Sequence, residues 1–335
     1  MKNQEKIFVI GHKNPDTDSI CSAIAYCDIK NRTTQESRYI PKRAGQINEE
    51  TEYVLNRFGV QPPGYLSNIG TQVKDMDIRL SPEANKSMSL KNAWDLMQEN
   101  SIVSLPIREK DGTLEGLITI GDIAKTYMDT TDSYLLSRAR TQYQRIAETI
   151  GGKVIEGNAH GYFIQGKIMV ATANPDKMKE YVEENDMVIM GNREEDHLQA
   201  IEQNVSCIIV GMGIEVTEKV LKLAHEKDIV IISSPYDTFT ISRLINQSIP
   251  VKYIMKTDNL VTFNTEDFTD DIQEVMIKHR HRAFPVINKK GKCIGTISRR
   301  NFLDMHRKKV VLVDHNEKDQ AVDNIDKADI MEIID

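Results

Sequence analysis

This sequence has few of the features that mark a disulfide scaffold, a membrane span or a nucleic-acid surface. It holds four cysteines in 335 residues, with no CxxC pair, so neither a disulfide framework nor a zinc knuckle is expected. No apolar run approaches the roughly 20 residues of a spanning helix, and residues 1–6 lack the layout of a signal peptide. The net charge of −7 argues against a nucleic-acid partner. We therefore expect a cytoplasmic protein, with reduced thiols, that binds neither membrane nor nucleic acid.

What is present is typical of a soluble globular protein. Hydrophobic residues make up 40% and charged residues 28% of the chain, and its length suggests two or three domains. Short apolar runs indicate buried parallel strands near both ends of the sequence. The expected strands are residues 7–10, 39–41, 309–313 and 330–334, with helices at 19–30 and 49–58.

An internal repeat divides the chain. Residues 97–122 and 276–301 align without a gap, and each copy reads as helix, strand, glycine turn, strand and helix. Two copies that flank a different segment suggest half-modules that pack together. Matching positions include Pro106 and Pro285, Gly112 and Gly291, and Gly116 and Gly295.

The segment between the copies, residues 150–240, alternates apolar runs with helical patterns. This order favours a parallel α/β sheet. The expected strands are residues 187–190, 207–210 and 229–232, and the expected helices are 194–203 and 215–227.

One candidate metal site follows the first strand, where His12, Asp16 and Asp18 stand on one short loop. Ligands of open α/β sheets bind at the carboxyl ends of strands. One imidazole with two carboxylates suits a divalent ion such as manganese, and Pro15 restricts the turn. The alternative is that Asp16 and Asp18 are only turn and N-cap residues.

A second carboxylate is in a comparable position near the end of the chain. Asp314 follows the apolar run 310–313, so it lies at the end of another expected strand. Taken alone, such an aspartate is more often a helix cap. The interpretation of Asp314 as a metal ligand is favoured when it is considered together with the His12 loop.

These motifs resemble those of the DHH-family manganese-dependent (family II) inorganic pyrophosphatases. The resemblance implies that His12, Asp16 and Asp18 are metal ligands and that Asp314 bridges two metals. It also implies that Asp335 is the first residue of an Asp-His-His motif whose histidines lie beyond this sequence, so that the isolated chain is incomplete as an enzyme. The matching segments are Gly11–Tyr26, Arg43–Gln46, Val313–Glu317 and Ile333–Asp335.

The repeats resemble CBS domains, in which Gly-x-x-[Thr/Ser]-x-x-Asp binds adenosine ligands. The nucleotide-binding residues implied are Thr119, Asp122, Ser298, Asn301 and Arg282, with Asn301 departing from the usual aspartate. A hydroxyl three residues before an acid is also a helix capping box, whatever else it does. For Arg282, surface solvation is an equally good explanation.

The segment between the repeats resembles a DRTGG domain, although the literal Asp-Arg-Thr-Gly-Gly string is absent. The predicted architecture is thus a parallel-sheet DHH phosphoesterase domain interrupted by a CBS pair and an α/β DRTGG-like domain. The expected boundaries are 1–66 with 309–335 for the DHH domain, 67–130 for the first CBS repeat, 131–248 for the DRTGG-like domain, and 249–308 for the second CBS repeat.

The resemblance implies hydrolysis of pyrophosphate with Mn²⁺, or alternatively Co²⁺ or Mg²⁺, in a homodimer formed through the CBS domains. The implied effector is an adenine nucleotide: AMP, ADP, ATP or a diadenosine polyphosphate. Two alternatives stay open at this point. One is a DHH phosphoesterase that acts on oligonucleotides or cyclic dinucleotides, and the other is a nucleotide-binding regulatory module without catalysis.

Overall fold

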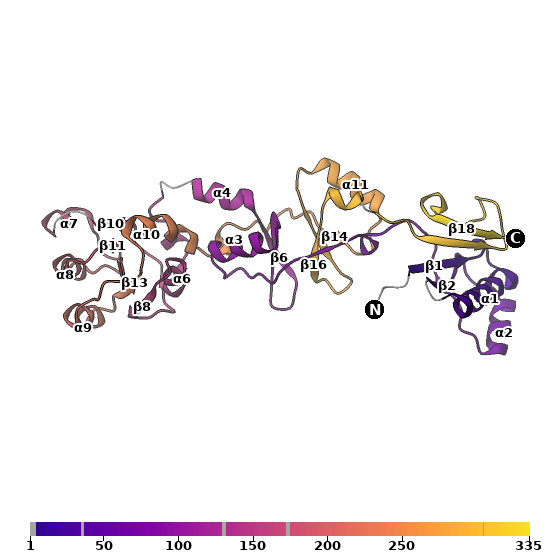
Figure 1. Ribbon diagram of the computed structural model, residues 1–335, viewed down its shortest axis with the longest axis horizontal. Helices are drawn as coiled ribbons and strands as arrows, with labels where there is room; N and C mark the ends of the chain where they lie inside the picture. Colours follow the sequence, from indigo (N-terminus) through magenta and orange to yellow (C-terminus); the bar gives the residue numbers. More distant parts are fainter. Residues whose placement is uncertain (1–4, 35–36, 129–131, 172–174, 304) are drawn as a thin grey trace. The chain divides into compact units, whose positions relative to one another are not determined.

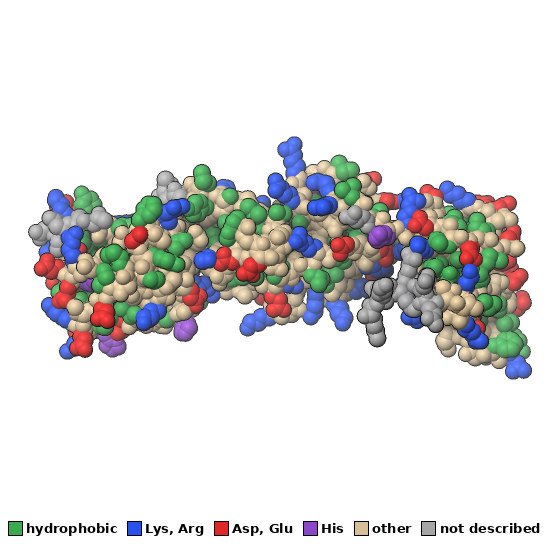
Figure 2. Space-filling model, in the orientation of Figure 1, with side chains coloured by type: hydrophobic (Ala, Val, Ile, Leu, Met, Phe, Trp, Pro, Cys, Tyr) green, Lys and Arg blue, Asp and Glu red, His purple; other side chains and the backbone are tan. Residues whose placement is uncertain are grey.

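The computed structural model describes residues 5–34, 37–128, 132–171, 175–303 and 305–335. Two compact units are present. The first consists of residues 1–79, 262–289 and 296–335, and the second of residues 80–261 and 290–295. On the face drawn in Figure 2, Lys and Arg side chains are interspersed with Asp and Glu side chains. Among the helices in the described ranges, none is long and apolar enough to cross a bilayer.

The first unit contains a five-stranded sheet with the strand order β18-β17-β1-β2-β3, and every pairing within it is parallel. Strands from the two ends of the sequence are therefore neighbours, as the indigo and yellow arrows in Figure 1 show. The elements are β1 (Glu5–Ile10), α1 (Thr17–Thr33), β2 (Ser37–Arg43), α2 (Glu49–Phe58), β3 (Gly64–Tyr65), β17 (Lys309–Val313), η5 (Ile325–Lys327) and β18 (Asp329–Ile334).

Alternation along β1 and β17 explains why both faces of this sheet are covered. Ile7 and Val9 share one face with Val311, and that face packs against Ala23 and Cys27 of α1. The residues that alternate with these along β1 and β17 face the other side of the sheet. There they form a second hydrophobic cluster with residues of the segment that follows β17. Each fully buried aliphatic side chain contributes about 1.5–3 kcal/mol. The pairing of β1 with β17 is therefore strongly specified, because a one-residue slip would reverse both faces.

The two repeat copies differ in their last helix. In the first copy α4 (Ile120–Met128) is a regular α-helix, whereas the second copy has only the 3-10 turn η4 (Arg299–Phe302) at the matching place. A helix therefore follows the second strand in both copies, as the repeat predicts, but in the second copy the described residues form only this short 3-10 helix.

The remaining elements of the copies agree with the repeat pattern. Strands β5 and β6 pair antiparallel in the first copy, and the matching strands β15 and β16 are neighbours in the sheet β14-β15-β16-β4. The elements are η1 (Val73–Asp75), β4 (Arg79–Leu80), α3 (Leu90–Glu99), β5 (Ser104–Arg108) and β6 (Leu114–Thr119), then η3 (Val251–Tyr253), β14 (Phe263–Asn264), α11 (Thr269–Lys278), β15 (Phe284–Ile287) and β16 (Cys293–Ile297).

The second unit contains another five-stranded sheet, with the order β10-β11-β12-β13-β8. Its first four strands are parallel and β8 is antiparallel to β13. Helices α7, α8 and α9 contribute to the core on one face, while α6 and α10 contribute to the core on the other. The elements are α5 (Leu135–Arg138), β7 (Thr141–Gln142), α6 (Tyr143–Thr149), β8 (Lys153–Glu156), β9 (Tyr162–Phe163), β10 (Ile168–Val170), α7 (Pro175–Tyr181), β11 (Met187–Met190), α8 (Glu194–Glu202), β12 (Cys207–Val210), α9 (Glu218–Glu226), β13 (Val230–Ser233), α10 (Thr238–Leu244) and η2 (Ile245–Ser248).

The α/β sheet expected between the repeats is thus present, and it is parallel except at its edge strand β8. A further difference from expectation is that α9 begins at Glu218 rather than at residue 215. The Thr217 hydroxyl accepts a hydrogen bond from the Val220 N–H and caps the helix there. A capping side chain therefore defines the start more sharply than the apolar period does.

Candidate functional site

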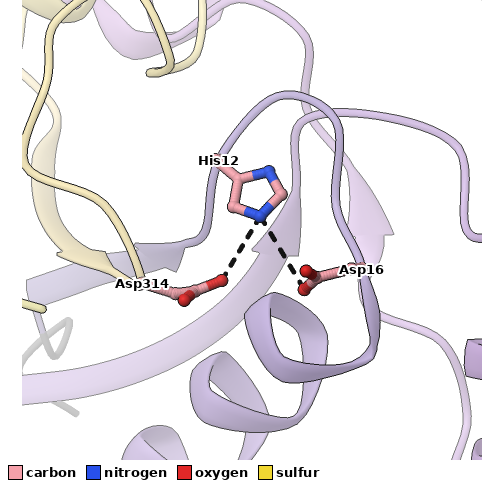
Figure 3. A group of neighbouring side chains, drawn as sticks. All are labelled: His12, Asp16 and Asp314. Carbon is pink, nitrogen blue, oxygen red and sulfur yellow. Dashed lines mark ion pairs between the residues drawn. The ribbon is translucent and has the colours of Figure 1, made fainter.

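Three side chains from opposite ends of the sequence converge at the carboxyl edge of the first sheet. His12 Nε2 lies 3.7 Å from Asp16 Oδ1 and 3.3 Å from Asp314 Oδ2 (Figure 3). One potential ligand atom from each residue lies within 4.8 Å of the other two. The convergence follows from the parallel pairing of β1 with β17, because each strand delivers its following loop to the same edge.

The loop after β1 is shaped by the start of α1. Asp16 is the N-cap of this helix, and its Oδ1 accepts a hydrogen bond from the Ser19 N–H at 3.0 Å. The N-cap role that the sequence left open is therefore present, together with the approach to His12. Asp18 is exposed, and its Oδ1 accepts from Ser22 Oγ at 3.4 Å. Of the four candidate ligands, the structure brings together three and leaves Asp18 outside that group.

Asp314 is held in an unusual environment. Its φ of 58° is in the left-handed region, which is strained for most side chains but tolerated by Asp and Asn. Burial raises the pKa of the Asp314 carboxyl, and the charge of Asp16 raises it further, with smaller contributions from Asp18 and Asp335. The His12 imidazole opposes this shift. A cation among these carboxylates would relieve the repulsion that they exert on each other.

The polar atoms around Asp314 fit a divalent cation. Among the described residues, buried Asp314 Oδ2 has no hydrogen-bond partner, although it forms the ion pair with His12, and buried His315 Nε2 has no hydrogen-bond partner either. Buried polar atoms are rarely left unpaired, so each such atom calls for an explanation. An imidazole and two carboxylates supply nitrogen and oxygen donors that manganese or cobalt accepts. The donor set, and the Asp314 oxygen that lacks a hydrogen bond, therefore agree with the sequence-based expectation of a metal at this place.

His315 is a residue to which the sequence reasoning gave no role. Its side chain is buried, Nδ1 donates to the Val313 carbonyl oxygen over 2.9 Å, and its ring stands edge-on to that of His12 with centroids 6.5 Å apart. Its neighbour Asn316 donates from Nδ2 to Asp335 Oδ2 at 2.6 Å. Only adjacency to Asp314 could have drawn attention to these two residues, because burial and pairing are not visible in a sequence.

Gly45, in the Arg43–Gln46 segment, touches the His12 loop so closely that no side chain fits. A Cβ atom at this position would overlap the Lys13 carbonyl oxygen and Pro15 Cδ. We expect Gly45→Ala to destabilise the first unit by about 1–3 kcal/mol, because backbone must move to accommodate the methyl group. Thermal unfolding checks this against Gly191→Ala, where an added Cβ meets no atom within 4 Å. Equal stability of the two variants would contradict the close approach.

The nucleotide-binding candidates of the first repeat form a reciprocal network at the start of α4. Asp122 Oδ2 accepts from the Thr119 N–H at 2.9 Å and from the Thr119 hydroxyl at 2.6 Å. The Asp122 N–H in turn donates to Thr119 Oγ1 over 3.3 Å, and Lys256 Nζ lies 3.4 Å from Asp122 Oδ1. This is the capping box that the spacing predicts, with a lysine added.

The second repeat repeats the pattern with an amide. Asn301 Oδ1 accepts from the Ser298 N–H at 2.7 Å and from the Ser298 hydroxyl at 2.8 Å. Its Nδ2 donates to the Asp77 carbonyl oxygen over 2.6 Å, a bond that an aspartate could not make. The side chain of Arg282 is exposed. The role of these residues in binding a nucleotide is therefore a proposal.

Comparison with known proteins places the middle of the chain in two domain families. The CBS domain model matches residues 77–129 and 251–308, and the DRTGG domain model matches residues 145–248. The CBS and DRTGG domains of the regulatory region of Clostridium perfringens pyrophosphatase, solved with the activator diadenosine tetraphosphate, superpose with a TM-score of 0.65 at 34% identity. This alignment covers 68% of the present chain and 100% of that chain. The chain belongs to the same family as this CBS–DRTGG regulatory region.

Two relatives extend this similarity to the sheet that carries His12 and Asp314. The cobalt-dependent inorganic pyrophosphatase of Clostridium perfringens is 38% identical over 333 residues, which is 99% of this chain and 60% of that protein. A probable manganese-dependent inorganic pyrophosphatase of Thermotoga maritima is 31% identical over 335 residues, or 100% and 61% respectively. The chain therefore spans about three fifths of the length of these two relatives. The resemblances to CBS and DRTGG domains are confirmed.

Proposed function

We propose that this chain is part of an inorganic pyrophosphatase that hydrolyses pyrophosphate to two phosphates and responds to adenine nucleotides. The observation that carries the proposal is the convergence of His12, Asp16 and Asp314 from loops about 300 residues apart in the sequence. Further support comes from the two relatives that span the whole chain, one named cobalt-dependent and the other manganese-dependent.

We propose that His12, Asp16 and Asp314 hold one Mn²⁺ or Co²⁺, and that Asp18 and Asp314 contribute to a second position. When bound, paired divalent cations supply a water of lowered pKa as the attacking group and offset the charge of the phosphates. The chain's own part is to orient its donors. Asp16 is oriented by its hydrogen bond as the N-cap of α1, and Asp314 by its left-handed backbone conformation. The Asp335 carboxylate accepts a hydrogen bond from the Asn316 side chain, which orients it.

The corresponding domains are proposed to be residues 1–66 with 309–335 for the DHH phosphoesterase part, 67–130 and 249–308 for the CBS repeats, and 131–248 for the DRTGG-like domain. Nucleotides would bind at the Thr119–Asp122 and Ser298–Asn301 turns, with Arg282 near the phosphates. The solved Clostridium perfringens regulatory region holds diadenosine tetraphosphate, which supports an adenine nucleotide here. AMP, ADP, ATP and diadenosine polyphosphates are the candidates. A nucleotide can regulate only if its affinity differs between two states of the protein.

A homodimer through the CBS domains is also proposed. Helices α3 and α4 border an apolar groove of about 300 Å³, lined in part by Trp94, Ile123 and Tyr127, and Met128 beside it is largely exposed. A second copy of the chain would cover such a surface.

We further propose a cytoplasmic location, supported by the buried thiols of Cys27 and Cys207. Burial raises the pKa of the Cys27 thiol to about 12.

The test uses the full-length protein and the 335-residue chain side by side. We expect the full-length protein to release phosphate from pyrophosphate when Mn²⁺ is present, and the chain to bind Mn²⁺ and diadenosine tetraphosphate. Faster hydrolysis of a cyclic dinucleotide than of pyrophosphate would favour the phosphoesterase alternative. Nucleotide binding without any Mn²⁺ binding or phosphate release would indicate a nucleotide-binding regulatory module without catalysis.

A further inference from the structure

Ser19 is a fully buried polar residue in the first turn of α1, with 0% of its surface exposed. Its Oγ accepts a hydrogen bond from the His12 backbone N–H over 3.1 Å. Its own N–H donates to Asp16 Oδ1 over 3.0 Å. One residue is therefore bonded to the backbone of His12 and to the side chain of Asp16, two of the three residues that converge at the carboxyl edge of the sheet.

These two bonds differ in what they require of the sequence. The bond to Asp16 comes from the backbone, so any residue at this position could form the helix cap. The bond to His12 needs a side-chain acceptor, because the His12 N–H points at the hydroxyl. A buried Ser19 is thus more than a component of the cap.

The packing around Ser19 indicates the same role. A Cβ atom added to Gly11 would overlap Ser19 Oγ, so the hydroxyl rests directly on the backbone where the chain leaves β1. The next residue is His12, whose N–H the hydroxyl receives. The contact at Gly11 and the hydrogen bond from His12 together fix the path of the backbone over the two residues that follow β1.

We propose that Ser19 is a positioning residue, which holds the His12 imidazole in register with Asp16 and Asp314. This inference rests on the proposed metal centre. Residues that orient metal ligands from the outer shell typically change metal affinity about 10- to 100-fold when they are replaced. Without the hydroxyl, the His12 backbone loses its anchor and the imidazole samples orientations away from the carboxylates. The Asp16 cap remains, because it depends on a backbone N–H.

The experiment measures Mn²⁺ affinity of the 335-residue chain by titration calorimetry, with metal-free thermal unfolding recorded for each protein. Ser19→Ala is expected to bind Mn²⁺ at least about tenfold more weakly than the wild type. Ser19→Cys fills the same place with a weak acceptor and is expected to lose affinity as well. Ser19→Thr retains the hydroxyl and is expected to restore most of the affinity.

Thr33→Ala is the matched control. Thr33 ends the same helix. Within the part of the chain that the structure describes, its hydroxyl donates only to the carbonyl oxygens of Ile29 and Lys30 in that helix. We expect this variant to bind Mn²⁺ like the wild type, even if its unfolding temperature falls slightly.

The outcomes separate the two proposals. If the wild-type chain binds Mn²⁺ and both Ser19→Ala and Ser19→Cys bind it with the same affinity, the positioning role of Ser19 is overturned. The proposed metal centre is then unaffected. A Ser19→Thr variant as weak as Ser19→Ala would also overturn it, provided that both unfold at similar temperatures. A wild-type chain that binds no Mn²⁺ would overturn the metal centre and this inference with it.

Discussion

Asp314→Asn is expected to remove Mn²⁺ binding while making the metal-free chain more stable. Asparagine tolerates the left-handed backbone at φ 58°, so the substitution adds no new strain. It removes a carboxylate whose pKa is raised by burial and by Asp16, which means that its charged form is unfavourable in the folded, metal-free chain. We expect the unfolding temperature of that chain to rise.

The same substitution is expected to lower Mn²⁺-dependent phosphate release by the full-length protein about a thousandfold. A metal centre contributes several kcal/mol to such a reaction, and each 1.4 kcal/mol is about tenfold in rate. The measurements are phosphate release at saturating Mn²⁺ and a thermal melt without metal. Asp319→Asn is the control, because Asp319 is an exposed carboxylate on the segment that follows Asp314. Unchanged Mn²⁺ affinity in Asp314→Asn would remove Asp314 from the ligand set.

Asp122→Ala is expected to weaken the binding of adenine nucleotides at least about tenfold. The carboxylate orders the Thr119 backbone and hydroxyl at the start of α4, and it lies 3.4 Å from Lys256 Nζ. Hydrogen bonds to a charged group contribute about 1.5–3 kcal/mol each, so loss of one contact to a ribose would already exceed tenfold. Titration with AMP and with diadenosine tetraphosphate measures the effect on the 335-residue chain.

A control is needed because Asp122→Ala also removes a helix cap. Asp237 caps α10 in the same unit by accepting from the Thr240 N–H at 2.7 Å. Both variants should lose stability by about 0.5–2 kcal/mol, but only Asp122→Ala should lose nucleotide affinity. If the two variants bound diadenosine tetraphosphate equally well, Asp122 would be a cap and nothing more.

The sequence predicted the sheets better than the details of the site. Apolar runs such as 309–313 and 207–210 identified buried strands, since a strand covered on both faces leaves little choice of residue. The convergence of His12 and Asp16 with Asp314 was implied by the resemblance, and the parallel pairing of β1 and β17 provides its physical reason. The site residues themselves remain proposals.

What the sequence could not provide depends on long-range packing. The burial of His315, the left-handed backbone at Asp314 and the bond from His12 to Ser19 arise only once β1, β17 and α1 are assembled. The short helix of the second repeat was not visible either, because its capping box matches that of the first copy although η4 is a 3-10 helix and α4 a longer α-helix.

The most direct test of the account is a crystal structure of the 335-residue chain soaked in Mn²⁺, with anomalous diffraction recorded to locate the ion. We predict an anomalous peak bounded by His12 Nε2 and by carboxylate oxygens of Asp16 and Asp314. The same crystal with Asp314→Asn should show no peak there. A wild-type peak elsewhere in the chain, with none at these three residues under saturating Mn²⁺, would contradict the proposed metal centre.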